Sequence, residues 1–280
     1  MKKYFHLLRV KHYIKNLLVI LPVFFNKTLF DEKLCILFWG GVSFCLISSA
    51  VYIINDINDL EKDRNHPTKK NRPIAKGDIS VTKAIVIAIF CIIVSISVSV
   101  IIGKIAASIF ILLYLIMNIL YSRGLKDVAI MDVFILASGF IIRILYGAYI
   151  TQVEVSNWLF LTIWAGAFYM GLGKRRNEYK LQSEEGETRK VLRAYTYTFL
   201  DKNMYACYTM TMIFYALWAL EQNDSLYLYT IPMVMLLMMK YSLAIEGASD
   251  GDPVEVIYRD KGLIFILIII ALSLTGILYL

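Results

Sequence analysis

Long apolar runs recur along the whole chain and constrain its fold more than any other feature. A helix needs about 20 apolar residues to cross the hydrocarbon core of a bilayer, and runs near that length recur. Of the 280 residues, 59% are hydrophobic, and the mean hydropathy is +0.62. Such a composition is too apolar for a soluble domain. We therefore expect an all-α, polytopic integral membrane protein.

The apolar runs predict nine membrane-spanning helices within a single domain that covers residues 1–280. Gly40-Gly41 interrupts the second span early, and Gly103-Lys104 separates the third span from the fourth. The basic N-terminal segment is not followed by a short apolar core and a small-residue cleavage site, so we expect no cleavable signal peptide. The expected spans are 17–37, 38–57, 84–102, 105–121, 129–149, 157–173, 204–221, 226–245 and 262–280.

Positive charges fall almost entirely on one side of this expected topology. If the N-terminus is cytoplasmic and the nine spans alternate, 25 of the 29 Lys and Arg residues lie in cytoplasmic segments and 3 in outer connections. The positive-inside rule therefore predicts a cytoplasmic N-terminus in a bacterial-type plasma membrane. The net charge of +7 then reflects topology and attraction to lipid headgroups, and it favours no nucleic-acid partner.

The long polar segments also share this cytoplasmic side. They include 59–83, 174–203 and 246–261, whereas the outer connections near 151–157 and 221–226 are short. This asymmetry predicts a site that opens toward the cytoplasm above the helix bundle. A channel would more often need polar residues through the whole membrane thickness. A transporter or a non-catalytic lipid scaffold stays open as an alternative from another class.

An acidic stripe directly follows the apolar run 44–54. Asn55, Asp59 and Asp63 are spaced by four, so they share one side of a helix, and Asp56 lies beside them. Carboxylates at the end of a membrane helix are costly to desolvate and are usually functional. Several on one stripe repel one another unless a cation lies between them, and hard oxygen ligands suit Mg²⁺ and a phosphorylated substrate. The alternative is a solvated helix end.

Basic residues follow the acidic stripe in the same loop. Lys69 and Arg72 stand between Pro67 and Pro73, which stiffen the loop on both sides. If Mg²⁺ binds the carboxylates, these bases are placed to clamp the outer oxygens of a diphosphate. Each of them also satisfies the positive-inside rule without any ligand.

Arg143 lies inside an apolar span. It follows Asp132 by eleven residues, about three helical turns, so the two share a face. A lone arginine at that depth must face the interior of the bundle and hold an anion. We predict a phosphate ligand, and the alternative is a structural ion pair with Asp132 or another buried acid.

Bases near other span ends complete the candidates. In the run Gly171-Leu172-Gly173-Lys174-Arg175-Arg176 the glycines leave space for a ligand, although the spacing differs from that of a P-loop. Lys174 is expected to point inward because it directly continues the sixth span. Lys15 precedes the first span, Lys126 lies at a helix boundary, and Arg259 lies at the start of the last span. Topology or interface anchoring explains these three positions nearly as well.

These features together resemble a known family. The pattern N-D-x-x-D-x-x-x-D at 55–63, the nine spans and the polar cytoplasmic loops are similar to the UbiA superfamily of intramembrane prenyltransferases over nearly the whole chain. Ordinary members carry a second Asp-rich motif in the third cytoplasmic loop, where this chain has bases. Val10 also stands where the family favours proline. A closer likeness, to the branch that transfers phosphoribose, is carried by Lys15-Asn16, the run 63–74 (D-R-N-H-P-T-K-K-N-R-P-I), Gly173-Lys174-Arg175 with Glu178, and Gly251-Asp252-Pro253 before Arg259-Asp260.

The resemblance implies a UbiA-like bundle and Mg²⁺-dependent transfer of 5-phosphoribose from phosphoribosyl pyrophosphate to a polyprenyl phosphate of the decaprenyl type, with release of pyrophosphate. One acidic cluster and several basic ones match the anions of that reaction. An alternative is a prenyltransferase that uses a prenyl diphosphate donor and an aromatic or other small acceptor. A homo-oligomer is compatible with the sequence, which does not demonstrate one. The implied catalytic residues are Asp59, Asn55, Asp56 and Asp63; the metal ligands are Asn55, Asp59 and Asp63; and the substrate-binding residues are Lys15, Lys69, Arg72, Lys126, Arg143, Lys174 and Arg259.

Overall fold

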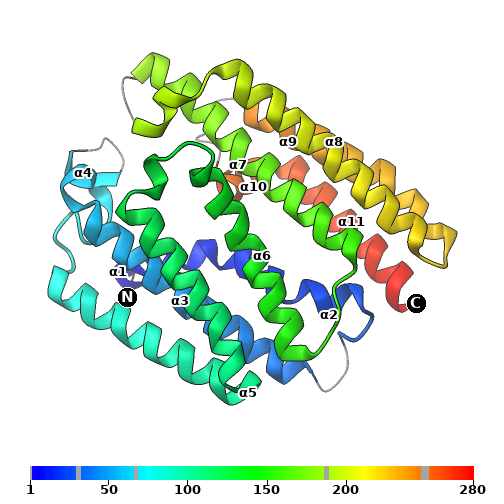
Figure 1. Cartoon of the computed structure of the whole chain (residues 1–280), viewed down its shortest axis with the longest axis horizontal. Coiled ribbons are helices and arrows are strands. Elements are labelled where there is room, and N and C mark those ends of the chain that lie inside the picture. The colour runs from blue at the N-terminus through cyan, green and yellow to red at the C-terminus, as the bar shows by residue number, and fades with distance from the viewer. Residues whose placement is uncertain (1, 30–32, 66–68, 186–188, 247–251) are drawn as a thin grey trace. The chain divides into compact units, whose positions relative to one another are not determined.

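The fold is helical throughout the part of the chain that is described. The structure is a computed structural model, and it describes residues 2–29, 33–65, 69–185, 189–246 and 252–280, without the side chains of 182–185. Every regular element in these ranges is a helix (Figure 1), which confirms the all-α prediction. Contacts divide the chain into two compact units: unit 1 comprises Met1–Leu125 and Ile142–Glu154, and unit 2 comprises Lys126–Ile141 and Val155–Leu280. The expectation of one domain stays a prediction.

Unit 1 is built around two long apolar helices, α3 and α5. Helix α5 is interrupted at Gly103 and Lys104, whose backbone angles are not helical, and Lys104 takes a φ of 60°. Figure 1 shows the chain reversing direction there, so α5 consists of two antiparallel helices, which confirms the predicted boundary between the third and fourth spans. The elements of unit 1 are α1 (Lys2–Leu7), η1 (Val10–Val19), α2 (Leu21–Phe25), α3 (Leu34–Asn58), α4 (Leu60–Arg64), η2 (Lys69–Asn71) and α5 (Val81–Arg123), and η3 (Leu125–Asp127) follows at its edge.

The first predicted span, 17–37, is wrong. Its residues fall into the end of the 3-10 helix η1, the five-residue helix α2 and the start of α3, with 30–32 outside the described residues. Pro22 lies in the first turn of α2, where its missing N–H costs nothing, and it favours a new helix start. Lys27 then takes a φ of 61°, a left-handed conformation that ends α2. Helix α3 in turn begins at Leu34, earlier than predicted.

Five helical segments are long and apolar enough to cross a membrane. They support an integral membrane protein, but they do not confirm the predicted count of nine spans. The two halves of α5 form one of these five segments, and among the described helices α7 and α8 are not in this set. The five segments are α3, α5, α6 (Met131–Thr151), Ser225–Glu246 and α11 (Lys261–Tyr279).

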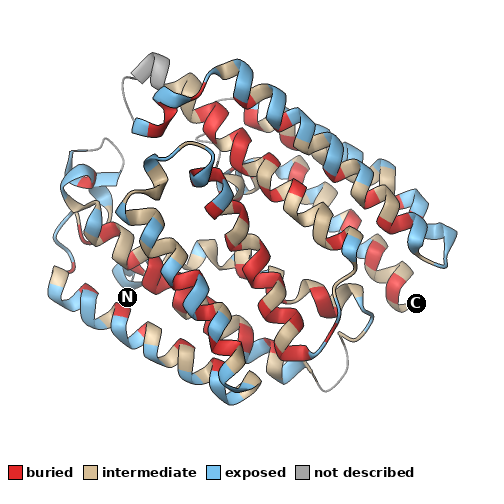
Figure 2. Cartoon of the chain, in the orientation of Figure 1, coloured by how far each residue is buried: buried red, intermediate tan, exposed pale blue. Residues whose placement is uncertain are grey.

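Exposed apolar side chains line α5, as a lipid-facing helix requires. Val86, Phe90 and Ile101 are 62%, 63% and 81% exposed, and Figure 2 shows many exposed residues along α5. In water, a surface of this kind would be costly. Its presence on a long, strongly apolar helix is consistent with contact between α5 and lipid tails.

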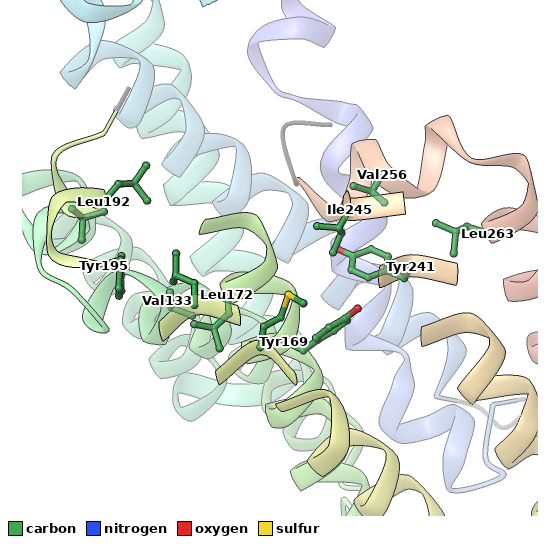
Figure 3. Close-up of a cluster of buried hydrophobic side chains, with 12 residues drawn as sticks. Val133, Tyr169, Leu172, Leu192, Tyr195, Tyr241, Ile245, Val256 and Leu263 are labelled. Atoms are coloured by element: carbon green, nitrogen blue, oxygen red, sulfur yellow. The ribbon is translucent and has the colours of Figure 1, made fainter. Parts of the chain in front are cut away.

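Unit 2 packs the second half of the chain around one cluster of buried apolar side chains. Figure 3 shows Tyr169, Leu172, Tyr241, Ile245 and other members of this cluster. The cluster draws on seven helical elements, α6 to α11 and η4. Helix α6 contributes its first part to this unit, and its remainder from Ile142 belongs to unit 1. The other elements of unit 2 are α7 (Asn157–Glu185), η4 (Lys190–Ala194), α8 (Tyr197–Glu221), η5 (Ser225–Tyr229), α9 (Thr230–Glu246), α10 (Pro253–Arg259) and α11.

Candidate active site

The acidic stripe runs from the end of α3 into α4, in unit 1. The N–H of Asp59 donates to the carbonyl oxygen of Asn55 at 2.9 Å, and the N–H of Asp63 donates to the carbonyl oxygen of Asp59 at 2.8 Å. These are i to i−4 bonds, so helical spacing persists although α3 formally ends at Asn58. Asn55, Asp59 and Asp63 therefore keep the spacing that places them on one side.

Two arginines neutralise the buried carboxylates of the stripe. Asp56 and Asp63 are 2% and 3% exposed. Nη1 of Arg72 donates to Oδ1 of Asp56 at 3.0 Å and to Oδ2 of Asp63 at 2.6 Å, so one guanidinium bridges both acids. Nη2 of Arg9 donates to the same Oδ1 of Asp56 at 2.5 Å. A buried carboxylate is stable only when it is paired in this way.

Asn55, the first member of the stripe, is tied to the end of α5. Its Oδ1 accepts a hydrogen bond from the hydroxyl of Ser122. Ser122 and Arg9 are contacts of the stripe that sequence reasoning missed. They lie 67 and 47 residues away from their partners in sequence, and neither carries a local pattern that could have marked it.

The chemistry of the stripe fits Mg²⁺. Its side chains offer carboxylate and amide oxygens, the ligand atoms that Mg²⁺ prefers. The guanidinium of Arg72 already places a positive charge between two of the carboxylates. Hydrogen bonds to Asp56 use Oδ1, and the bond to Asp63 uses Oδ2. Within the described ranges, no group of three or more His, Cys, Asp or Glu residues meets the criterion for a preformed metal site.

Arg143 lies among polar side chains inside unit 1 and is 5% exposed. Its Nε donates to Oδ1 of Asn16 at 2.8 Å, and its Nη2 donates to the hydroxyl of Tyr114 at 3.0 Å and to that of Ser48 at 3.4 Å. Its Cζ lies 4.9 Å from the ring centre of Phe44, a cation–π distance. The arginine therefore faces the interior of unit 1, in agreement with the requirement for a buried charge.

A close contact between η1 and α6 brings Asn16 to Arg143. Gly147 lies one turn after Arg143, and a Cβ at this glycine would collide with the backbone carbonyl of Val19. Glycine therefore permits the backbones of α6 and η1 to touch at this point. Asn16 lies one turn before Val19, so the contact places its side chain against the guanidinium.

In unit 2, Lys174 and its two neighbours have different environments. Arg175 and Arg176 are each 0% exposed, whereas the side chain of Lys174 is 24% exposed. Nζ of Lys174 lies 3.1 Å from Oδ2 of Asp252. The other oxygen of Asp252 accepts from the N–H of Val254 at the start of α10. Lys174 is thus the most exposed of the three bases, and its role as a phosphate ligand stays a prediction.

Arg175 is the centre of a buried ion network. Its Nε donates to Oδ2 of Asp132, and its Nη1 donates to Glu178 at 2.6 Å. Oδ1 of Asp132 accepts from the hydroxyl of Tyr195 at 2.6 Å. Asp132 thus pairs with Arg175. These contacts do not form the alternative ion pair between Asp132 and Arg143. Burial, together with the bond to Asp132, raises the pKa of Tyr195, so this hydroxyl stays a donor at neutral pH.

Arg176 is likewise committed to acids of unit 2. Its Nη1 lies 2.9 Å from Asp201, and its Nη2 lies 2.7 Å from Glu246. Two of the three consecutive bases therefore serve the structure of unit 2. A run of basic residues after a membrane span indicates the cytoplasmic side. The acidic partners of each base show which bases are engaged in the structure of unit 2.

Glu178 gives the network a pH dependence that can be measured. Burial alone would raise its pKa, but the charges of Arg175, Arg189 and Lys174 hold the pKa at about 2. Because this lies below its ordinary value of 4.5, the ionised carboxylate stabilises the fold above about pH 4.5, and this contribution, about 3 kcal/mol, is lost as pH falls toward 2. We expect Glu178→Gln to flatten the decline of unfolding temperature between pH 5 and pH 3 in detergent.

The matched control for this prediction is Glu255→Gln. Glu255 pairs with Arg259 across one helical turn, and both side chains are largely exposed, at 47% and 62%. Pairs of this kind contribute little, so the control should keep the acid-side slope of the unaltered protein. If both variants keep the full slope, the ion network around Glu178 is not what resists acid.

The remaining predicted residues lie in various settings. Lys15 and Lys126 are half-buried, and Lys69 is exposed at the start of η2. Arg259 lies on the exposed face of α10, 3.3 Å from Glu255, so its ligand role stays a prediction. His66, Pro67 and Thr68 of the predicted phosphate loop, and Gly251 before Asp252, lie outside the described residues.

The fold and these clusters define a class of protein. It is a helical integral membrane protein that gathers oxygen ligands and guanidinium groups at the end of an apolar helix. Buried carboxylates and arginines in such a position are expensive, and they are kept where charged substrates react.

The chain belongs to the UbiA prenyltransferase family, whose sequence profile matches residues 19–259. It is 32% identical over 270 residues to "Decaprenyl-phosphate phosphoribosyltransferase" of Corynebacterium glutamicum, covering 91% of this chain and 80% of that one. It is 30% identical over 263 residues to the protein of the same name from Mycobacterium tuberculosis H37Rv, with 91% and 87% covered. These findings confirm the resemblance and show that the chain is an enzyme, a transferase of this family.

A solved structure shares the fold. It is a UbiA homologue of Archaeoglobus fulgidus bound to GPP and Mg²⁺, with a TM-score of 0.76 at 21% identity, covering 98% of this chain and 97% of that one. At this identity the likeness shows the fold alone. It confirms the predicted UbiA-like arrangement of helices.

Proposed function

We propose that the enzyme transfers 5-phosphoribose from phosphoribosyl pyrophosphate to a polyprenyl phosphate of the decaprenyl type and releases pyrophosphate. The similarity to relatives that bear this name, over 91% of the chain, is the observation that carries the proposal. The active site faces the cytoplasm in this proposal, as the distribution of positive charge predicts.

Asn55, Asp59 and Asp63 are proposed to hold Mg²⁺, with Asp56 beside them. When bound, the ion supplies Lewis-acid stabilisation of the negative charge that develops on the diphosphate. The stripe supports this role because its donors are oxygens at helical spacing. Asp56 and Asp63 have a second task, since they orient the guanidinium of Arg72.

The bases are proposed to bind the phosphate groups of both substrates. Arg72 and Lys69 contact the donor diphosphate, and Arg72 starts from a defined position between two carboxylates. Such a guanidinium offers planar paired donors to phosphate oxygens. The other phosphate ligands in this proposal are Lys15 at the lipid headgroup, and Lys126, Arg143, Lys174 and Arg259 for the remaining phosphate groups.

The chemical step needs little from the protein beyond charge and position. An oxygen of the lipid phosphate attacks the anomeric carbon, and the bond from that carbon to pyrophosphate breaks. The acceptor is already ionised, so no general base is required. The transition state is oxocarbenium-like, and the chain's task is to stabilise the leaving group and exclude water.

Prenyl transfer is the second candidate function because family members act in that way and A. fulgidus homologues bind GPP or DMAPP. In this chain the third loop carries Lys174, Arg175 and Arg176 where prenyltransferases have their second acidic motif. The burial of Arg175 and Arg176 in ion networks makes these residues part of unit 2 rather than a ligand site for a second metal.

Donor choice decides between the two reactions. We expect purified protein in lipid nanodiscs to convert decaprenyl phosphate into a labelled lipid when it receives radiolabelled phosphoribosyl pyrophosphate and Mg²⁺, and EDTA to prevent this. A parallel reaction with geranyl diphosphate and 4-hydroxybenzoate should give no product. Prenylation without phosphoribosylation would overturn the proposal.

A further inference from the structure

Arg9 is held against the acidic stripe by two independent contacts. It lies between α1 and η1 with φ of 50° and ψ of 47°, a left-handed conformation that is uncommon for an arginine. Its Nη2 donates to Asp56 at 2.5 Å, and its Cζ lies 4.6 Å from the ring centre of Tyr52. Tyr52 and Asp56 are one turn apart on α3, so one helix face fixes both the edge and the plane of the guanidinium.

Arg9 keeps hydrogen-bond donors for a ligand. A guanidinium has five N–H groups, and the hydrogen bond to Asp56 uses only Nη2. The side chain is 20% exposed, and that of Arg72 is 26% exposed. The guanidinium is therefore bound to the acidic stripe through Nη2 on a side chain that remains partly exposed.

Arg9 and Arg72 converge on one atom. Both donate to Oδ1 of Asp56, so their guanidiniums lie next to each other above a single carboxylate. Arg72 bridges both Asp56 and Asp63, so it alone would leave this pair of carboxylates with a net negative charge, and Arg9 supplies the second positive charge. The two carboxylates thus hold the two guanidiniums in place, and both arginine side chains remain partly exposed. Two adjacent, partly exposed guanidiniums are a binding arrangement for a doubly charged oxyanion.

We propose that Arg9 is a phosphate-binding residue that forms, with Arg72, a two-arginine clamp for one phosphate group. The identity of the ligand rests on the proposed function, which supplies two sources of the same chemistry. One is the pyrophosphoryl group of the donor, and the other is the phosphate of the lipid acceptor. The position of Arg9 in the acidic cluster carries the assignment of the residue itself.

Binding measurements without turnover test the clamp. Inorganic pyrophosphate with Mg²⁺, and a short-chain polyprenyl phosphate, are titrated separately into the purified full-length protein by isothermal calorimetry. We expect Arg9→Gln to weaken binding of one of the two probes by about tenfold or more, the usual effect of losing a charged hydrogen bond. Arg9→Lys keeps the charge without the planar fork and should recover part of the affinity. The affected probe identifies the source of the phosphate.

The control is Arg123→Gln, at the exposed end of α5 in the same unit. It makes the same change of charge, and it should bind both probes as the unaltered protein does. If Arg9→Gln also binds both probes normally, or if Arg123→Gln weakens them equally, the clamp is excluded. If Arg9→Gln does not fold, Tyr52→Leu removes the aromatic face beneath the guanidinium and keeps the arginine; unchanged binding in that variant would exclude the clamp as well.

The outcome is separable from that of the proposed function. The transfer assay could give no phosphoribosylated lipid while Arg9→Gln still weakens the binding of pyrophosphate. In that case Arg9 remains a phosphate ligand of a different reaction. Should transfer proceed and both probes bind Arg9→Gln normally, the enzyme is assigned correctly and Arg9 serves only to tie the N-terminal segment to α3.

Discussion

Asp59→Asn is expected to abolish Mg²⁺-dependent labelling of polyprenyl phosphate and to leave the protein folded. Asparagine has the shape of aspartate, and the backbone bonds that join Asp59 to Asn55 and Asp63 do not involve the side chain. What is lost is one negative charge on the metal-binding stripe. Charge stabilisation by a bound metal amounts to several kcal/mol, so the rate should fall by about a thousandfold or more.

The matched control is Glu61→Gln, two residues further along α4. Glu61 is an exposed acid, with 80% of its side chain accessible, and it pairs with Arg64 on the surface. The control makes the same change of charge near the stripe and should retain activity. Rates are measured over a range of Mg²⁺ concentrations, with unfolding temperature as the check on folding. Full activity of Asp59→Asn at saturating Mg²⁺ would remove the metal assignment.

The spacing of residues in the sequence predicts the structure correctly where the deciding contacts are between residues close in sequence. The stripe from Asn55 to Asp63 depends on i to i−4 bonds within one helical stretch, and the structure keeps them. The reversal at Gly103-Lys104 was predictable for the same reason, because a glycine and a charged residue interrupt an apolar run. In the range 17–37, the apolar composition favours one span, whereas Pro22 favours a new helix start, and α2 does begin at Leu21.

The inward-facing base of a cationic run could not be chosen from sequence. The sequence predicts that Lys174 points inward, but Arg175 and Arg176 are the fully buried residues of the run. The reason lies in partners that are distant in sequence: Asp132 is 43 residues from Arg175, and Glu246 is 70 residues from Arg176. Burial of a charge is decided by the acid that meets it, and no local pattern announces that acid.

Arg143 shows a mixed outcome for the same physical reason. Its depth in an apolar span predicted an interior position, and the structure places it there. Its neutral partners Asn16, Ser48 and Tyr114 come from three different elements, which a single sequence cannot connect. The sequence marks Lys15-Asn16 as part of the family likeness, but it does not predict that Asn16 contacts Arg143 or that Arg9, just before η1, contacts Asp56.

Asp132→Ala is expected to have the largest effect on stability of any change in unit 2. Asp132 is 0% exposed and holds both Nε of Arg175 and the hydroxyl of Tyr195. Removing one partner of a buried ion pair leaves an uncompensated charge in a low-dielectric interior. The expected loss is about 3–5 kcal/mol, measured as a fall in unfolding temperature in detergent.

Two further variants separate the contributions of the network. Tyr195→Phe deletes one hydroxyl, which donates to Asp132 and accepts from the N–H of Ile130 at 2.6 Å. It should cost about 1–3 kcal/mol because Asp132 stays buried without this hydrogen-bond donor. Asp127→Ala removes an exposed acid from the same connection and should change stability by less than about 0.5 kcal/mol.

The double variant Asp132→Asn with Arg175→Gln distinguishes charge from packing. Both side chains keep hydrogen-bonding capacity, and the pair no longer contains a charge without its counterpart. If charge compensation dominates, the double variant should unfold at a higher temperature than Asp132→Ala, since buried ion pairs contribute less than the penalty for breaking them. If instead the double variant is the least stable, the network stabilises unit 2 by specific packing of the guanidinium. An Asp132→Ala variant as stable as the unaltered protein would show that Arg175 is compensated by Glu178 alone.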